Sequence, residues 1–452
     1  MNKQPMEMQP NIEIGIIKKE RIDFRLSGVF TFFNAPEARF NQGQAFAENG
    51  RLVIKTDEKT FYFDKEVSFI PDDLTVCHFE IKEVIIGVDF HWEQKEDQKF
   101  QGTLKLILVG DEIQVINILP VENYLISVIS SEMSASSSLN LLKAHAIISR
   151  SWLLAQIQKQ NDLVSAKTTY QLIHQTDEEY IRWYDREDHT LFHVCADDHC
   201  QRYQGITRAN NPRVVEAVQE TMGQVLMYDN KICDARFSKS CGGVAERFEN
   251  CWEPVSHPYL TAVIDHPKPT HLHTMDLTLE KNARDFIHAN PEAFCNTKDE
   301  KVLTQVLNNY DLVAKDFYRW QVTYSQEQLS ALILNKSGID FGQIIDLIPM
   351  ERGTSGRLIK LKIVGTKKAR IVGKELEIRR WLSESHLYSS AFTIEKLHFT
   401  GTIPGSFTLH GAGWGHGVGL CQIGAAVMGE KGYTYTEILM HYFRNAEIRK
   451  EY

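Results

Sequence analysis

The chain has 452 residues, of which 43% are hydrophobic, and it carries a formal net charge of -9. This charge does not favour a nucleic-acid partner, and the lack of any run of about 18 apolar residues argues against a transmembrane helix. The length predicts about two to four domains. The start, Met1-Asn-Lys-Gln-Pro-Met-Glu-Met, lacks the apolar core of a signal peptide. We therefore expect either a cytoplasmic protein or one whose signal is absent from this chain.

Residues 1–115 are predicted to form an N-terminal β-rich domain. Short runs of β-branched or aliphatic residues alternate there with turn signals, which is typical of strands. The runs are 12–16, 51–55, 84–88 and 104–108.

Two helices are predicted next, at about 121–132 and 139–157. On the first, Leu125, Val128, Ile129 and Glu132 recur at the spacing of a single helical face. A serine-rich run at 134–138 supplies N-cap candidates for the second helix.

The rest of the chain mixes both kinds of element. We expect short strands and loops over 160–265, a helical patch over 274–316, and β-structure with one helix, Gln326–Leu334, over 318–382. Further strands are expected within 357–364 and 386–400, and helices at 422–428 and 436–442. The predicted class is α+β, with mixed β-rich domains, a small helical catalytic segment and a helical insertion. The predicted parts are 1–115, a catalytic domain in two pieces (116–270 and 318–452), and an insertion at 271–317.

A carboxylate ends the apolar stripe of the first helix. If Glu132 faces the interior, desolvation raises its pKa, and a carboxyl group that stays protonated near neutral pH can act as a general acid. The alternative is an inert, half-exposed last turn. Lys143 and Arg150 share a face of the second helix and could hold an anionic substrate group or position the acid. Their alternative is a solvated helix face.

A glycine-rich run, Gly411-Ala-Gly-Trp-Gly-His-Gly-Val-Gly419, stands near the C-terminal end. Alternate glycines indicate positive φ angles or close approach of the backbone to another group. The run has neither the Gly-Lys-Ser/Thr of a phosphate loop nor the third glycine of a dinucleotide fingerprint. We expect a loop that presents His416 to a ligand; the alternative is a glycine-rich turn under tight packing.

Cysteine and histidine residues gather between positions 189 and 200. Zinc takes four Cys or His ligands, usually anchored by two nearby thiolates. The predicted ligands of a structural zinc ion are His189, Cys195, His199 and Cys200. His193 competes for either histidine place, and the alternative is buried free cysteines with surface histidines. Cys241 and Cys251 form a separate pair, a disulfide if the protein is exported and free thiols if it is not.

Several motifs together resemble the stage II sporulation protein D / amidase-enhancer family, over about 117–452. They are Leu119-Pro-Val-Glu-Asn-Tyr-Leu-Ile-Ser-Val-Ile-Ser-Ser-Glu-Met133, Leu142-Lys-Ala-His-Ala-Ile-Ile-Ser-Arg-Ser-Trp152, Ser238-Lys-Ser-Cys-Gly-Gly243, Glu351-Arg-Gly-Thr-Ser-Gly-Arg357, Gly413-Trp-Gly-His-Gly-Val-Gly-Leu-Cys-Gln422 and Gly432-Tyr-Thr-Tyr-Thr-Glu-Ile-Leu-Met-His-Tyr-Phe443. Cys241 and Cys421 stand where the family more often has serine.

The resemblance implies a lytic transglycosylase that cleaves peptidoglycan glycan strands, especially strands without stem peptides. It makes Glu132 the catalytic acid and ties Arg150 to activity. It also implies that some members hold zinc in the region of the Cys/His cluster. The residues that it places on the substrate side are Lys143, Ser240, Gly242, Gly243, His416 and Gln422.

Two other functions remain open at this point. One is a non-catalytic glycan-binding protein or an activator of another cell-wall hydrolase such as an amidase. The other is a zinc hydrolase in which Glu132 is the base. A lytic transglycosylase needs a single carboxylate, whereas a glycoside hydrolase normally needs two.

Overall fold

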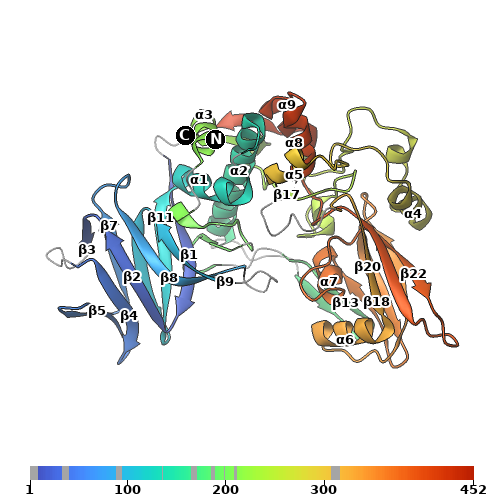
Figure 1. Ribbon diagram of the computed structural model, residues 1–452, viewed down its shortest axis with the longest axis horizontal. Coiled ribbons are helices and arrows are strands. Elements are labelled where there is room, and N and C mark those ends of the chain that lie inside the picture. The colour runs from blue at the N-terminus through green and yellow to red at the C-terminus, as the bar shows by residue number, and fades with distance from the viewer. Residues whose placement is uncertain are drawn as a thin grey trace.

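The computed structural model describes residues 9–32, 40–87, 94–134, 136–163, 171–184, 189–197, 199–207, 211–306 and 316–452. Helices and sheets are both abundant in these residues, so the predicted α+β class is confirmed. Figure 1 shows three parts in a row: a pair of sheets at the left, a layer of helices in the centre and further sheets at the right.

The left part is a sandwich of two six-stranded sheets, with strand orders β14-β1-β11-β10-β7-β3 and β6-β5-β4-β2-β8-β9. In β2 the alternate residues Ile22, Phe24 and Leu26 are buried, as expected for a half-buried strand. The rings of Phe24 and Phe69, one from each sheet, lie 5.3 Å apart. The strands are β1 (Asn11–Lys19), β2 (Arg21–Ser27), β3 (Phe30–Phe32), β4 (Gln42–Glu48), β5 (Arg51–Lys55), β6 (Thr60–Phe63), β7 (Glu66–Pro71), β8 (His78–Ile86), β9 (Gln94–Phe100), β10 (Thr103–Val109), β11 (Glu112–Pro120) and β14 (Val194–Cys195).

The strands predicted at 12–16, 51–55 and 104–108 are confirmed as parts of β1, β5 and β10. The run at 84–88 belongs to β8 as far as Ile86, and residue 88 lies outside the described residues.

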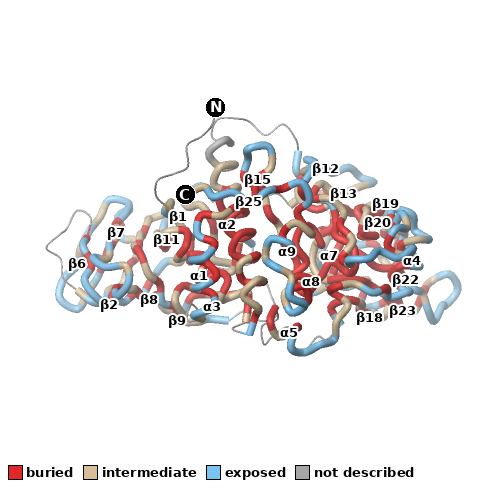
Figure 2. The backbone as a smooth tube through the Cα atoms, turned by 90° about the horizontal axis from the view of Figure 1, so that it is seen from above, coloured by how far each residue is buried: buried red, intermediate tan, exposed pale blue. Residues whose placement is uncertain are grey.

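The central part packs around α2 (Leu139–Leu163), which contacts α1 (Val121–Glu132), α3 (Pro212–Glu220), α8 (Gln422–Glu430) and α9 (Tyr435–Tyr442). It includes a small sheet of β16 (Lys231–Ile232), β15 (Gln224–Tyr228) and β25 (Glu447–Lys450). The last helices and strand of the chain therefore return to the helices that follow the sandwich. One hydrophobic core joins the sandwich to this layer, and Figure 2 shows the buried segments running through it.

The right part has its own core, around Trp320, Leu361 and Phe407. Its sheets have the orders β12-β13-β21-β20-β19 and β18-β23-β22. The elements are β12 (Ile173–Gln175), β13 (Glu179–Arg182), β18 (Arg319–Ser325), α6 (Gln326–Ser337), β19 (Ile344–Arg352), β20 (Leu358–Gly365), β21 (Ala369–Gly373), α7 (Glu375–Trp381), β22 (Phe392–Leu397) and β23 (Ser406–Ala412).

The segment predicted as a helical insertion contains α4 (Glu280–Ala289) and α5 (Glu300–Val306). Helix α5 packs against α8, and Val302, Leu303 and Val306 are buried. This segment is part of the packed structure rather than a separate appendage. A short parallel pair, β17 (Phe237–Ser238) with β24 (Leu420–Cys421), joins the same region.

Two helices occur where strands or loops were predicted, namely α3 and α7. Helix α3 has clear start signals, since Asn211 accepts a hydrogen bond from the Arg213 amide and Pro212 occupies the first turn. Helix α2 continues to Leu163, beyond the predicted end at 157. None of the helices within the described ranges is long and apolar enough to span a membrane.

Candidate functional site

Glu132 is the last residue of α1 and is half-buried. The helix forms as predicted over 121–132, and its apolar stripe of Leu125, Val128 and Ile129 is fully buried. The helix ends because Met133 takes an extended conformation, with its amide donating to the Ile129 carbonyl. The carboxylate therefore stands at the rim of the core, at the end of a rigid element.

The four predicted metal ligands lie together. Their ligand atoms, one from each of His189, Cys195, His199 and Cys200, are all within 4.8 Å of one another. Cys200 Sγ is 3.5 Å from His189 Nε2 and 3.6 Å from His199 Nδ1, and Cys195 Sγ is 3.8 Å from the same nitrogen. Zinc bonds of about 2.3 Å to sulfur and about 2.1 Å to nitrogen place such atoms about 3.6 Å apart on a tetrahedron. The cluster has the size of a mononuclear site.

The competing ligand, His193, has another role. Its Nδ1 accepts a hydrogen bond from the Glu13 amide, 3.0 Å away, which fixes the loop to β1. A hydrogen bond with Cys200 lowers the pKa of Cys195 well below its usual range, and a metal ligand must be a thiolate.

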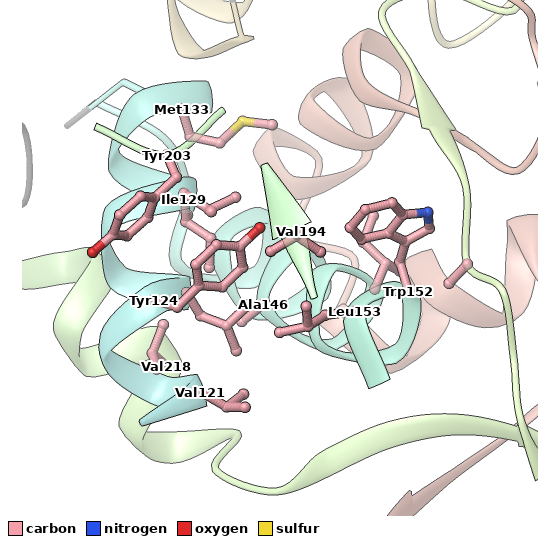
Figure 3. Packing of buried hydrophobic residues seen from close by; sticks show 14 of the residues in the cluster. Val121, Tyr124, Ile129, Met133, Ala146, Trp152, Leu153, Val194, Tyr203 and Val218 are labelled. Carbon is pink, nitrogen blue, oxygen red and sulfur yellow. The ribbon is translucent and has the colours of Figure 1, made fainter. Parts of the chain in front are cut away.

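The cluster and Glu132 share one environment. Tyr124, on α1, stacks on Tyr203 with ring centroids 5.2 Å apart, and Figure 3 shows both rings among the buried side chains of this core. Burial, together with the nearby thiols of Cys200 and Cys195 and the carboxylate of Glu132, raises the pKa of Tyr124 well above its usual range. The candidate acid and the candidate metal centre therefore flank the same buried tyrosine.

Helix α5 links this region to the loop at 238–243. The Ser134 amide, two residues after Glu132, donates to the Gln305 carbonyl at 2.9 Å. Lys239 Nζ donates to the next carbonyl, that of Val306, at 2.7 Å. The segment that ends α1 and the loop at 238–243 thus bind the same end of α5.

Arg150 lies too deep to touch a substrate, which corrects its predicted catalytic role. Its side chain is fully buried and forms two hydrogen bonds with the Glu122 carboxylate, at 3.0 and 2.7 Å. A third donor reaches the Gln224 carbonyl at 2.9 Å. Arg150 therefore ties α2 to α1 and β15, and we assign it a positioning role.

Lys143 and Gln422 also bond within the protein. Lys143 forms an ion pair with Glu220 of α3, on the same side of α2 as Arg150. Gln422 is buried, and its side chain lies 3.2 Å from His145 Nε2, where it joins α8 to α2. Neither arrangement supports the predicted contact with substrate.

The glycine-rich loop encloses an arginine instead of a ligand. Arg357 is buried, and it donates to the carbonyl oxygens of Gly415 and Cys241, both 3.1 Å away. Gly417 has a φ of 76°, and a Cβ atom there would lie 2.4 Å from Arg357 Cζ. Glycine is required because the backbone turns around the guanidinium.

His416 is half-buried and both of its ring nitrogens bond within the protein, so its presentation to a ligand stays a prediction. Its Nε2 donates to the Phe237 carbonyl at 2.9 Å, and its Nδ1 accepts from the Val418 amide at 3.0 Å. Burial and the nearby cations of Arg236 and Arg357 hold the pKa of His416 well below its usual range. The neutral ring fixes the loop.

The loop at 238–243 packs in the same way. Ser240 and Trp414 exchange backbone hydrogen bonds of 3.0 and 2.8 Å, and the Ser240 side chain is fully buried. A Cβ atom on Gly242 would lie 2.8 Å from the Gly413 nitrogen, and one on Gly243 would lie 2.9 Å from the Tyr318 hydroxyl. These three residues are buried and form a contact between backbones.

Glu246 is a structural residue that the sequence did not indicate. It is fully buried and accepts hydrogen bonds from the amide and hydroxyl groups of Thr354 and Ser355, at 2.6 to 3.2 Å. The motif 351–357 thus holds a buried carboxylate and a buried arginine. The serine and threonine of this motif were the only hint in the sequence, because their hydroxyl groups can donate hydrogen bonds to a carboxylate.

Comparison with known proteins bears on the segment that holds these features. Residues 109–228 match the family described as Stage II sporulation protein. The resemblance inferred from the motifs is thereby confirmed, and the matched segment contains Glu132, Arg150 and all four residues of the Cys/His cluster. Residues 246–419, with the glycine-rich loop, match a second family, a domain of unknown function called DUF8618.

Several curated relatives carry names that agree with this match. The stage II sporulation protein D of Bacillus amyloliquefaciens is 24% identical over 340 residues, which cover 73% of this chain and 74% of that protein. The amidase enhancer of Bacillus subtilis is 25% identical over 326 residues, which cover 70% of this chain but only 39% of that longer protein. An uncharacterized protein of Brachyspira hyodysenteriae is 25% identical over 350 residues.

Proposed function

We propose that this protein is a peptidoglycan lytic transglycosylase in which Glu132 is the general acid and base. The observation that carries the proposal is the position of Glu132, half-buried at the end of α1 within the stage II sporulation protein domain. The negative end of the helix dipole lies there. The names of the relatives support a role at the cell wall.

A single carboxylate can perform both proton transfers of this reaction. The protonated carboxyl of Glu132 donates to the oxygen that links C1 of N-acetylmuramic acid to the next sugar, and the C1–O bond breaks. The carboxylate then takes the proton from the C6 hydroxyl of the same N-acetylmuramic acid. The C6 oxygen of the sugar then bonds to C1 and closes a 1,6-anhydro ring. No water is consumed, so no second carboxylate is needed to activate water.

The Cys/His cluster suits a structural zinc ion. His189, Cys195, His199 and Cys200 supply four protein ligands at tetrahedral spacing, which leaves no open position for a metal-bound water. The ion would fix the loop that carries β14 and Tyr203 against α1, and so would hold the helix that presents Glu132. This closed ligand set disfavours the zinc hydrolase alternative.

An activator of a cell-wall amidase is the second candidate. The name of the similar amidase enhancer favours this function, which does not depend on Glu132. The two functions can therefore be distinguished by whether activity requires the carboxyl group of Glu132.

The test is product analysis after incubation with peptidoglycan glycan strands whose stem peptides have been removed. We expect products ending in 1,6-anhydro-N-acetylmuramic acid from the wild type and none from Glu132→Gln. Glu216→Gln, which changes an exposed glutamate of α3, is the matched control and should match the wild type. Glycan binding with no cleavage by any of the three proteins would favour the activator.

A further inference from the structure

A second group of metal-binding side chains lies inside the protein, apart from the Cys/His cluster. It consists of Cys241, Asp265, Cys295 and Cys421, whose ligand atoms are all within 4.8 Å of one another. All four residues are buried, with exposed fractions of 3%, 0%, 1% and 0%. We propose that these side chains form a second site, which binds one zinc ion through three thiolates and one carboxylate.

The geometry fits a single ion. Cys241 Sγ lies 3.6 Å from Cys295 Sγ, and two sulfurs bound to one zinc at about 2.3 Å lie about 3.8 Å apart on a tetrahedron. Thiolates select zinc or another thiophilic ion over calcium and magnesium, which prefer oxygen ligands.

The carboxylate of Asp265 is already oriented by its neighbours. Its Oδ1 accepts a hydrogen bond from the Tyr442 hydroxyl at 2.6 Å, and its Oδ2 accepts one from the Cys295 amide at 2.8 Å. Burying a carboxylate is costly unless an opposite charge is close. A divalent ion bound to the three sulfurs would supply that charge and would release the thiol protons to solvent.

The groups that surround the four side chains suit a site with excess negative charge. The Cys241 amide donates to Cys421 Sγ at 3.2 Å. The guanidinium groups of Arg319 and Arg357 donate to the carbonyl oxygens of Gly242 and Cys241, at 3.0 and 3.1 Å. Such partners orient and stabilise metal ligands.

The four ligands come from distant parts of the chain. Cys241 lies in the loop at 238–243, Cys421 directly follows the glycine-rich loop, and Cys295 lies between α4 and α5. Asp265 lies in the loop before that segment. The ion would therefore join the two loops to the 271–317 segment.

The neighbouring cysteine, Cys251, is not part of the site. Its Sγ lies 3.7 Å from the His416 carbonyl oxygen, whereas Cys241 contacts Cys295 and Cys421. Of the two states expected for Cys241 and Cys251, a disulfide or free thiols, the structure has free thiols.

The test is the zinc content of the full chain, purified with a reductant, measured by mass spectrometry of the metal. We expect two ions per chain in the wild type and one in Cys421→Ser. The double variant Cys195→Ser/Cys200→Ser should keep one ion, at the buried site. Cys233→Ser alters a buried cysteine outside both clusters and should keep two. A wild type with one ion that the Cys195/Cys200 variant loses would overturn the proposal.

A second measurement uses a variant in which all four side chains of the buried site are kept. Cobalt(II) added to the metal-free Cys195→Ser/Cys200→Ser protein should give the visible bands of a tetrahedral ion and strong thiolate-to-cobalt charge transfer. An absence of both signals, or a disulfide between Cys241 and Cys295 in the reduced preparation, would refute the site.

Discussion

The buried ion pair between Glu122 and Arg150 allows a stability effect to be calculated from the structure. The side chains are 10% and 0% exposed. Removing one partner of such a pair costs about 3–5 kcal/mol, because the other charge remains buried. Replacing both partners with apolar side chains of similar size is often nearly neutral.

The remaining contacts of each partner decide which single variant loses more free energy of unfolding. After Arg150→Met, the Glu122 carboxylate keeps the Tyr452 hydroxyl at 2.6 Å and the Gly223 amide at 3.2 Å. We therefore expect the free energy of unfolding to fall by about 3 kcal/mol, the lower end of this range. After Glu122→Met, the guanidinium keeps neutral partners such as the carbonyls of Ala146 and Gln224, and we expect a loss of about 5 kcal/mol in the free energy of unfolding.

The assay is urea unfolding of the wild type, both single variants and the double variant, followed by tryptophan fluorescence. The double variant should be much more stable than the sum of the single losses implies. Single losses below about 1 kcal/mol, or losses that simply add, would show that the pair does not hold α1 and α2 together.

Three further variants test other parts of the structure. Gly417→Ala should destabilise the protein more than Gly432→Ala in thermal unfolding, because both residues have positive φ but only the Cβ at 417 meets Arg357; equal losses would contradict the packing around the arginine. Burial lowers the pKa of His145 from 6.5 to about 3. Between pH 6.5 and about pH 3 the imidazole is therefore protonated in the unfolded chain but neutral in the folded protein, and the free energy of unfolding falls as the pH drops through this range. His145→Gln should flatten that dependence in urea titrations, and an unchanged slope would refute the assignment. Zinc should raise the unfolding temperature of the metal-free wild type more than that of Cys195→Ser/Cys200→Ser, because metal binding stabilises the folded state; equal shifts in calorimetry would exclude the Cys/His cluster as a stabilising site.

The sequence was most informative where a pattern is local. Apolar periodicity predicted α1 with its end at Glu132, and the spacing of thiols and imidazoles predicted four residues that the fold brings together. Helix α6 was equally predictable, because Ser325 and Gln328 form a capping box.

Features that depend on distant residues were not predictable. The glycines at 413–419 indicated close approach of the backbone, but the group approached is Arg357, more than fifty residues earlier in the chain. The buried site likewise joins Cys241 to Cys295 and Cys421, although Cys251 lies nearer to Cys241 in the sequence. Spacing along the chain does not reveal such neighbours.

The most direct test of the central claim is the reaction in water enriched in heavy oxygen. A transglycosylase that uses Glu132 closes the ring with the sugar's own hydroxyl, so the new ends should be 1,6-anhydro and carry no label. Glu132→Gln should form no such ends. Labelled reducing ends that persist in Glu132→Gln would contradict the account, because water would then be the nucleophile and Glu132 would not be the acid.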